Sequence, residues 1–138
     1  MLAVFDTNVL VSGLRSARGA SNAVLQRVAL GHCKAAISTA LLLEYEDVLN
    51  RPGLLAGYSP GMIATFLDSF CSGACESFIY FRWRPFRADP GDDLVFECAL
   101  ASGATHIVTH NGRDFKGTED FGVSAVTPAD FLAILPAI

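Results

Sequence analysis

The stretch Leu2-Ala3-Val4-Phe5-Asp6-Thr7-Asn8 opens the chain with apolar residues that a carboxylate follows at once. A short apolar run that ends in a polar turn is typical of a strand buried in a parallel sheet. A charge directly after such a strand is costly unless it is solvated or paired. We therefore expect Leu2–Phe5 to be a strand and Asp6 to belong to a site at its end. The alternative is an Asx turn that only closes the strand.

Apolar runs and helix signals alternate along the rest of the chain. Further strands are expected at Lys34–Ile37, Phe78–Phe81, His106–Thr109 and Val123–Val126. Helices are expected over Asn22–Leu30, Leu41–Asn50, from Pro60 through Phe70, Leu94–Ala101 and Pro128–Leu135, with a loop over Gly13–Gly19. This alternation predicts one domain over residues 1–138, an α/β fold that is a three-layer α/β/α sandwich with a central, mostly parallel five-stranded sheet.

Hydroxyl and acidic residues precede most of the expected helices, as N-caps do. The candidate caps are Ser21, Ser38 or Thr39, Ser59, and Asp92 or Asp93. The helix after Pro60 has an apolar face of Ile63, Phe66, Leu67 and Phe70 at helical spacing. We expect that face to pack in the core.

Composition limits the function classes. Hydrophobic residues make up 51% of the chain and charged residues 17%, which is too apolar for a disordered protein. The net charge is −4, from 14 acidic and 10 basic residues. If the four acids Asp6, Glu44, Asp93 and Asp114 form a site, ten acidic and ten basic residues remain outside it. The net charge therefore does not argue against a nucleic-acid substrate.

The chain shows no targeting or membrane signal. No apolar stretch reaches the ~18 residues that a spanning helix needs, and no leader-like segment precedes the first strand. The four cysteines, Cys33, Cys71, Cys75 and Cys98, form no CxxC pair. Cys71 and Cys75 are expected to be buried thiols on one helix face rather than zinc ligands. We therefore expect a cytoplasmic protein.

Four acids stand where an α/β fold gathers its functional groups. They are Asp6, Glu44, Asp93 and Asp114. Positions just past the strand ends converge on one edge of the sheet, where neighbouring carboxylates raise each other's pKa. A bound divalent cation resolves that repulsion. The pattern favours a metal-dependent enzyme that acts on a phosphate ester.

Each of these acids has a plainer interpretation. Acids at a helix start commonly serve as N-caps; Asp92 suits that role, which leaves Asp93 for the site. Glu46 and Asp47 compete with Glu44, but a solvated helix face suits them better. Asp114 would otherwise cap a loop.

These motifs together resemble the PIN-domain family of small metal-dependent ribonucleases, which includes VapC-type toxins. Val4–Ser12 resembles its first motif, Ser38–Pro52 the second, Asp92-Asp93 with the following helix the third, and Ile107–Phe115 the fourth. The Asp89/Asp92/Asp93 cluster permits more than one register, and the helix spacing to Gly103 favours Asp93.

The resemblance implies the following site and partners. The acidic site falls on Asp6, Glu44, Asp93 and Asp114, with Asp6, Asp93 and Asp114 as metal ligands and Asn8 and Thr109 as supporting residues. The metal would be Mg²⁺ or Mn²⁺, because all the ligands are hard oxygen donors. RNA would be the substrate, an antitoxin protein a partner, and a homodimer the assembly. His110 stands where relatives often have Gly.

Basic residues supply candidate RNA contacts, because Arg neutralises phosphate. They are Arg15, Arg18, Arg82, Arg84 and Arg113. Arg82 and Arg84 interleave with Trp83 and Phe86, which would allow base stacking. The alternative is an edge strand whose aromatic side chains reach the core and whose arginines are solvated.

Three other functions compete with a toxin ribonuclease. A PIN nuclease of RNA processing would have the same residues, and so would a catalytically silent binding module. A phosphotransferase with Asp6 as nucleophile would need a second Asp two residues later, where this chain has Asn8. The sequence disfavours that last alternative.

Overall fold

A computed structural model of the 138-residue chain describes residues 1–76 and 90–137. Its strands are β1 Leu2–Phe5, β2 Lys34–Ile37, β3 Cys75–Glu76, β4 His106–Val108 and β5 Ser124–Val126. Its α-helices are α1 Thr7–Arg15, α2 Ala20–Ala29, α3 Thr39–Leu49, α4 Pro60–Ser72, α5 Pro90–Ser102 and α6 Pro128–Ile134. Two short 3-10 helices, η1 Gly112–Phe115 and η2 Thr118–Phe121, lie between β4 and β5.

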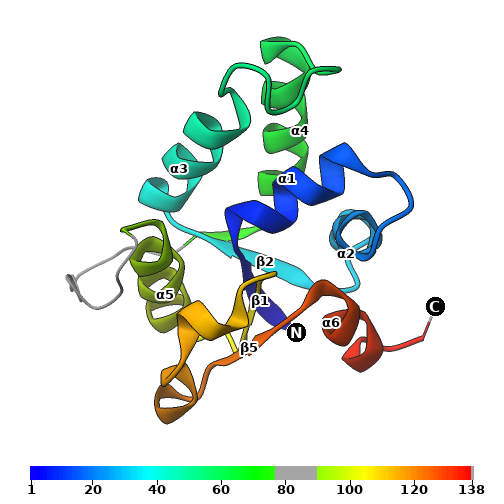
Figure 1. The fold of residues 1–138 in the computed structure, drawn as a ribbon. Coiled ribbons are helices and arrows are strands. Elements are labelled where there is room, and N and C mark those ends of the chain that lie inside the picture. Colours follow the sequence, from blue (N-terminus) through cyan, green and yellow to red (C-terminus); the bar gives the residue numbers. More distant parts are fainter. Residues whose placement is uncertain (77–89, 138) are drawn as a thin grey trace.

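The strands form one sheet in the order β3-β2-β1-β4-β5, and every neighbouring pair is parallel. Helix α5 packs on β1, β2 and β4. Helices α2 and α6 contact each other and cover the opposite face (Figure 1). The predicted α/β/α sandwich with a five-stranded sheet is therefore confirmed, and the sheet is parallel throughout the described residues.

Helix boundaries follow the capping chemistry at several places. The Ser38 hydroxyl accepts a hydrogen bond from the Leu41 N–H at 3.1 Å, which starts α3. Ser59 does the same for the Met62 N–H at 3.2 Å, which starts α4. Gly103 follows α5 with a φ of +74°, a conformation that favours glycine. These predicted starts and this stop are confirmed.

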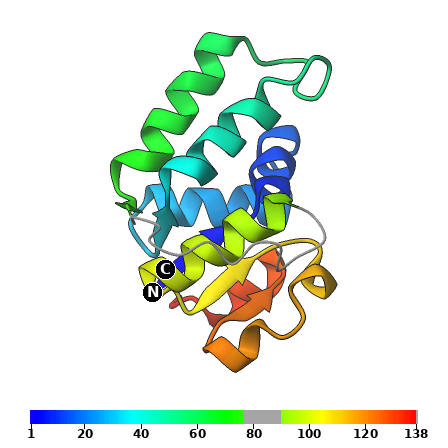
Figure 2. The same cartoon turned by 90° about the vertical axis from the view of Figure 1, so that its left-hand side faces the viewer.

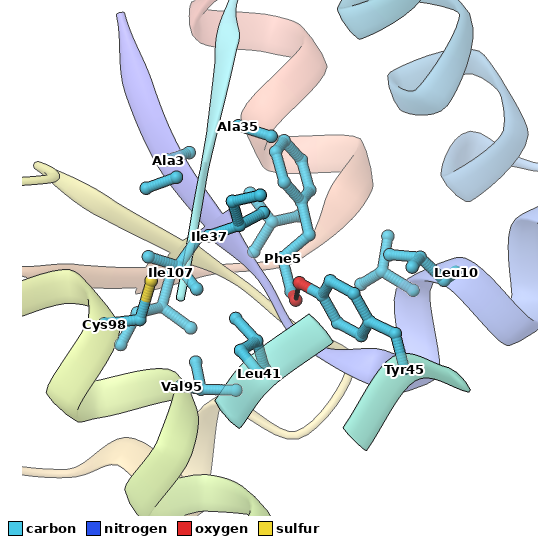
Figure 3. Close-up of a cluster of buried hydrophobic side chains, with 14 of the residues drawn as sticks. Ala3, Phe5, Leu10, Ala35, Ile37, Leu41, Tyr45, Val95, Cys98 and Ile107 are labelled. Atoms are coloured by element: carbon cyan, nitrogen blue, oxygen red, sulfur yellow. Dashed lines mark hydrogen bonds between the residues drawn. The ribbon is translucent and has the colours of Figure 1, made fainter. Parts of the chain in front are cut away.

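The core is built on β1. The Phe5 ring lies edge-on to Phe70 of α4 and to Phe131 of α6, with ring centres about 6.0 and 5.9 Å apart. Tyr45 of α3 packs edge-on against Phe70 as well. Figure 3 shows the side chains of Phe5 and Tyr45 in this cluster. The face of α4 that includes Phe70 packs in the core, as predicted.

Three predictions about the first half of the chain are wrong. Helix α1 begins directly after Asp6, where the sequence analysis placed no helix before the Gly13–Gly19 loop. Helix α2 begins at Ala20 with Gly19 at the N-cap, so Ser21 does not cap it. Cys75 lies in β3, and therefore it does not share a helix face with Cys71.

Two further predictions concern the second half. Helix α5 begins at Pro90, so Asp92 and Asp93 lie in its first turn and neither is the cap. The strand predicted at Phe78–Phe81 lies outside the described residues, and β3 occupies the edge of the sheet next to β2. Among the described helices none is both long enough and apolar enough to cross a membrane.

Candidate functional site

The centre of the candidate site is Asp6, which ends β1 and precedes α1. Its neighbour across the sheet is Thr109, the residue after β4. The Thr109 hydroxyl donates to Asp6 Oδ2 at 2.7 Å. The chain leaves β1 toward β2 and leaves β4 toward β5, so the crossovers diverge between these two strands. Ligands of open α/β sheets bind in the crevice at such a point.

Asn8 and His110 extend this arrangement around Asp6. The Asn8 side-chain amide donates to Asp6 Oδ2 at 3.3 Å, and its Oδ1 accepts from the His110 N–H at 3.4 Å. The His110 ring lies 2.8 Å from the hydroxyl of Ser21, which is buried in α2. The His110 side chain is thus held toward α2, and Asn8 and Thr109 both orient the Asp6 carboxylate.

Behind Asp6 the site rests on neutral buried groups. The Tyr45 hydroxyl donates to the main-chain oxygen of Phe5 (Figure 3). Burial, with the nearby Cys98 and Asp6, holds the pKa of Tyr45 well above its usual value. Burial raises the pKa of the Cys98 thiol to about 12, opposed by a hydrogen bond with Ser38. Both groups therefore stay neutral beneath the site.

Glu44 reaches the same edge through α3. Tyr45, the next residue, hydrogen-bonds to Phe5, so this turn of α3 lies over the end of β1. The Glu44 side chain is half-buried, whereas Glu46 and Asp47 are exposed. Glu46 and Asp47 fit the predicted solvated helix face, and Glu44 is the least exposed of the three acids.

Asp93 approaches from α5. That helix runs toward the start of β4, so its first turn lies at the carboxyl edge of the sheet. Asp93 is buried, with an exposed fraction of 3%. Glu97, four residues later on the same helix face, is equally buried. Buried carboxylates are costly unless they are paired or bound, and this helix has two of them.

Asp114 is the outermost of the four acids. It lies in η1 and is exposed, and its N–H donates to the Asn111 main-chain oxygen at 2.9 Å. The Asn111 N–H in turn donates to the Thr109 hydroxyl at 3.0 Å. Since η1 also contacts α5, Asp114 belongs to the same edge of the sheet as Asp6 and Asp93.

The donor chemistry of this edge suits a hard divalent cation, because every candidate ligand is a carboxylate oxygen. Within residues 1–76 and 90–137, however, no three His, Cys, Asp or Glu side chains are grouped closely enough to hold a metal ion directly. Mg²⁺ usually keeps several waters and binds through one or two carboxylates. The arrangement therefore fits a cation that Asp6 contacts and that other acids reach through water.

The candidate RNA-binding arginines have different locations. Arg15 is exposed at the end of α1, Arg18 is exposed between α1 and α2, and Arg113 is exposed in η1 beside Asp114. Arg82 and Arg84 lie outside the described residues. The structure thus brings Arg113 to the acidic edge and puts Arg15 one helix length away from it.

Sequence reasoning missed three residues around the site. Tyr45 was not singled out, although a buried hydroxyl needs a partner. Ser21 was assigned to a cap and instead contacts His110. Glu97 interrupts the apolar stretch Leu94–Leu100 four residues after Asp93, a spacing that could have revealed it.

The sequence matches the PIN domain family over residues 3–113. The chain belongs to the PIN domain family. The match includes Asp6, Glu44 and Asp93 and ends one residue before Asp114. A comparison with curated proteins finds no match.

The fold of this PIN domain is also similar to solved structures. One is the crystal structure of VapBC2 from Rickettsia felis bound to a DNA fragment from their promoter. The similarity has a TM-score of 0.63 and covers 92% of this chain and 98% of that chain, at 18% sequence identity. At that identity the likeness establishes the fold alone.

Proposed function

We propose that this PIN domain is a metal-dependent endoribonuclease that hydrolyses RNA phosphodiester bonds. The observation that carries the proposal is the hydrogen bond of 2.7 Å from Thr109 to Asp6 between β1 and β4, in a chain of the PIN family. It orients a carboxylate where α/β enzymes bind their substrates. In this proposal residues 1–138 act as a single nuclease domain.

The site residues would divide the work as follows. Asp6 and Asp93 would be the principal ligands of Mg²⁺ or Mn²⁺, directly or through water. Asp114 would hold a bridging water or a second cation, and Glu44 would position the attacking water. When bound, the cation would lower the pKa of that water and stabilise the negative charge on the phosphoryl oxygens. Thr109 and Asn8 would keep Asp6 in the orientation that the cation needs.

The finer proposal is that the protein is the toxin of a toxin–antitoxin pair in the cytoplasm. Its support is the structural likeness to VapBC2, which covers 92% of this chain. The proposed partners are an antitoxin protein and a second copy of the chain. A PIN nuclease of RNA processing is the alternative. Growth arrest on expression, relieved by the product of an adjacent gene, would separate the two.

The first experiment is cleavage of a labelled RNA mixture by the purified protein with Mn²⁺, with Mg²⁺ and with chelator. Asp6→Asn removes the charge and keeps the shape, so we expect cleavage to fall at least ~100-fold. Asp68→Asn is the matched control, because it makes the same chemical change at an exposed residue of α4 that is not one of the candidate site acids. It should cleave as wild type does.

Three results would contradict the proposal. Cleavage that persists in Asp6→Asn would assign the activity to another site or to a contaminant. An equal loss in Asp68→Asn would show that Asp6 has no special role. A folded wild-type protein that neither cuts RNA nor binds Mn²⁺ would favour a silent PIN module.

A further inference from the structure

Helices α1 and α3 leave the same edge of the sheet next to each other. Helix α1 follows β1 and α3 follows β2, and these strands are parallel neighbours. The two helices contact each other (Figures 1 and 2). The Tyr58 hydroxyl donates to the Leu14 main-chain oxygen at 3.0 Å, which ties the segment after α3 to the end of α1.

Each helix presents a matching row of side chains to the space between them. On α1 the row is Asn8, Ser12 and Arg15, at positions i, i+4 and i+7, which share one helix face. Val48 of α3 lies four residues after Glu44, on the same helix face, and Arg51 follows just after α3, which ends at Leu49. An arginine thus stands at the end of α1 and another just beyond the end of α3.

The two rows line an open groove of about 520 Å³. Its walls include Asn8, Ser12 and Arg15 from α1, Val48 from α3, and Arg51 and Leu54 from the segment after α3. Asn8 is also the residue that bonds to Asp6. The groove therefore adjoins the carboxylate site at Asn8.

Two arginines, Arg15 and Arg51, line this groove beside the candidate site. Arg15 is exposed and makes no ion pair within the described part of the chain. Arg51 lies 3.2 Å from Asp47, but both side chains are largely solvated, so this pair holds the arginine weakly. Both guanidinium groups are consequently able to pair with an anion that enters the groove.

We infer that this groove binds the phosphodiester backbone of the RNA strand on one side of the cleaved bond. The inference rests on the proposed function and identifies where its substrate lies. Arg15 and Arg51 neutralise phosphates, the Ser12 hydroxyl donates to the backbone between them and the site, and Val48 and Leu54 contact the apolar faces of the nucleotides.

The dimensions and the charge support this occupant. Seven residues separate Asn8 from Arg15, which is about 10 Å along an α-helix. That length spans about three nucleotides of a strand that rises ~3.4 Å per step. The acids of the site repel phosphate, and the chain carries a net charge of −4. Cations beside the site are therefore needed to hold RNA against that repulsion.

The test compares RNA binding by wild type, Arg15→Gln/Arg51→Gln and the control Lys34→Gln. Lys34 is an exposed cation at the amino end of β2, at the opposite edge of the sheet. The probe is a labelled 12-nucleotide single-stranded RNA of random sequence, titrated by fluorescence anisotropy in EDTA at several salt concentrations. The double variant should bind about tenfold more weakly, and its salt slope should fall by ~1.4, or ~0.7 per lost phosphate contact.

A cleavage assay with Mg²⁺ separates binding from structure. In the double variant KM should rise while kcat stays within about twofold, because the arginines do not touch the reacting phosphate. A single uncharged methylphosphonate linkage, moved stepwise away from the cut, should weaken wild-type binding at about three nucleotides from the cut. The same linkage should have no effect on the double variant.

The outcomes distinguish this inference from the function on which it rests. Wild-type cleavage with unchanged binding and salt slope in the double variant would overturn the groove and leave the nuclease standing. An equal loss in Lys34→Gln would indicate a general charge effect and would overturn the groove as well. A wild-type protein that neither binds nor cuts RNA would overturn both.

Discussion

The two edges of one parallel sheet carry opposite chemistry in this protein. At the carboxyl edge, a carboxylate or a hydroxyl side chain directly follows β1, β2, β4 and β5: Asp6, Ser38, Thr109 and Thr127. Near the amino edge, a groove of about 400 Å³ between α2 and α4 combines apolar side chains and a thiol with Lys34, Ser69 and Ser72; the apolar residues and the thiol are Leu25, Val28, Cys33, Phe66 and Phe70. The residues placed directly after the strands therefore distinguish the carboxyl edge.

The carboxyl edge also divides its polar residues between two tasks. Ser38 and Thr127 use their hydroxyls to cap α3 and α6, which is a structural task. Asp6 occupies the N-cap position of α1 but makes no capping bond with its side chain. Its carboxylate instead accepts from Thr109 and Asn8. Unlike Ser38 and Thr127, Asp6 therefore has a side chain that is oriented by its neighbours and does not cap the helix that follows it.

The largest expected effect comes from a substitution in the groove between α2 and α4. It tests whether the residues there stabilise the fold without taking part in catalysis. Phe70 is buried and contacts the rings of Phe5, Tyr45 and Phe66. Phe70→Ala should lower the free energy of unfolding by about 3–5 kcal/mol, because it deletes a core ring and leaves a cavity. Urea denaturation followed by far-UV circular dichroism measures this loss.

The same variant has a second readout. Cleavage per folded molecule, measured well below the melting temperature, should stay close to wild type. Met62→Ala on α4 is a suitable control, because Met62 is 51% exposed and should change stability little. A Phe70→Ala protein that keeps its stability but loses activity would break the division between the two edges.

The next effect tests the carboxyl edge. Thr109→Val keeps the shape of a fully buried side chain and removes the hydroxyl that donates to Asp6. Loss of such a supporting partner typically costs 10–100-fold in metal affinity or activity, so we expect Mn²⁺ affinity and cleavage to fall by about tenfold or more. Calorimetric titration with Mn²⁺ measures the metal affinity, and an assay with labelled RNA measures the cleavage.

Thr109→Ser is the matched variant, because it restores the hydroxyl and loses only a methyl group. It should recover most of the metal affinity at a small cost in packing. Equal defects in the Val and Ser variants would mean that the methyl group, and not the hydrogen bond to Asp6, is what the site requires.

Much of the fold followed from local patterns. The β1 and β2 runs, the caps Ser38 and Ser59, and the glycine stop at Gly103 were predicted correctly, because each depends on a few adjacent residues. Helix α1 was missed because its cap position, Asp6, had been assigned to chemistry and its interior contains Gly13. A Cβ atom at position 13 would lie 2.5 Å from Cδ1 of Leu25, which is too close. This close approach explains why a glycine stands inside that helix.

The site was predictable in its parts and not in its connections. Strand ends were enough to choose Asp6 and Asp114, but the bond from Thr109 to Asp6 joins residues 103 positions apart. The same holds for Ser21 and His110, which meet across 89 positions. Such contacts depend on the packing of whole elements, which no local spacing encodes.

The smallest effect concerns the amino end of β4. His106 begins that strand, its ring lies tilted against the Phe131 ring with the ring centres 5.9 Å apart, and its Nδ1 lies 2.7 Å from the Thr105 hydroxyl. Burial lowers its pKa from the usual 6.5. The unfolded chain therefore binds a proton at a higher pH than the folded chain does. Stability from the neutral imidazole is fully present above pH 6.5 and is lost as the pH falls through the folded pKa.

His106→Gln should flatten this part of the stability profile. Urea unfolding of wild type and variant at several pH values from 7.5 to 5 gives the difference between their free energies of unfolding. All other residues are common to both proteins, so their contributions cancel in that difference. We expect the wild type to lose its advantage over His106→Gln as the pH drops below 6.5. A difference that stays constant with pH would show that burial of His106 does not make the stability of the fold depend on pH.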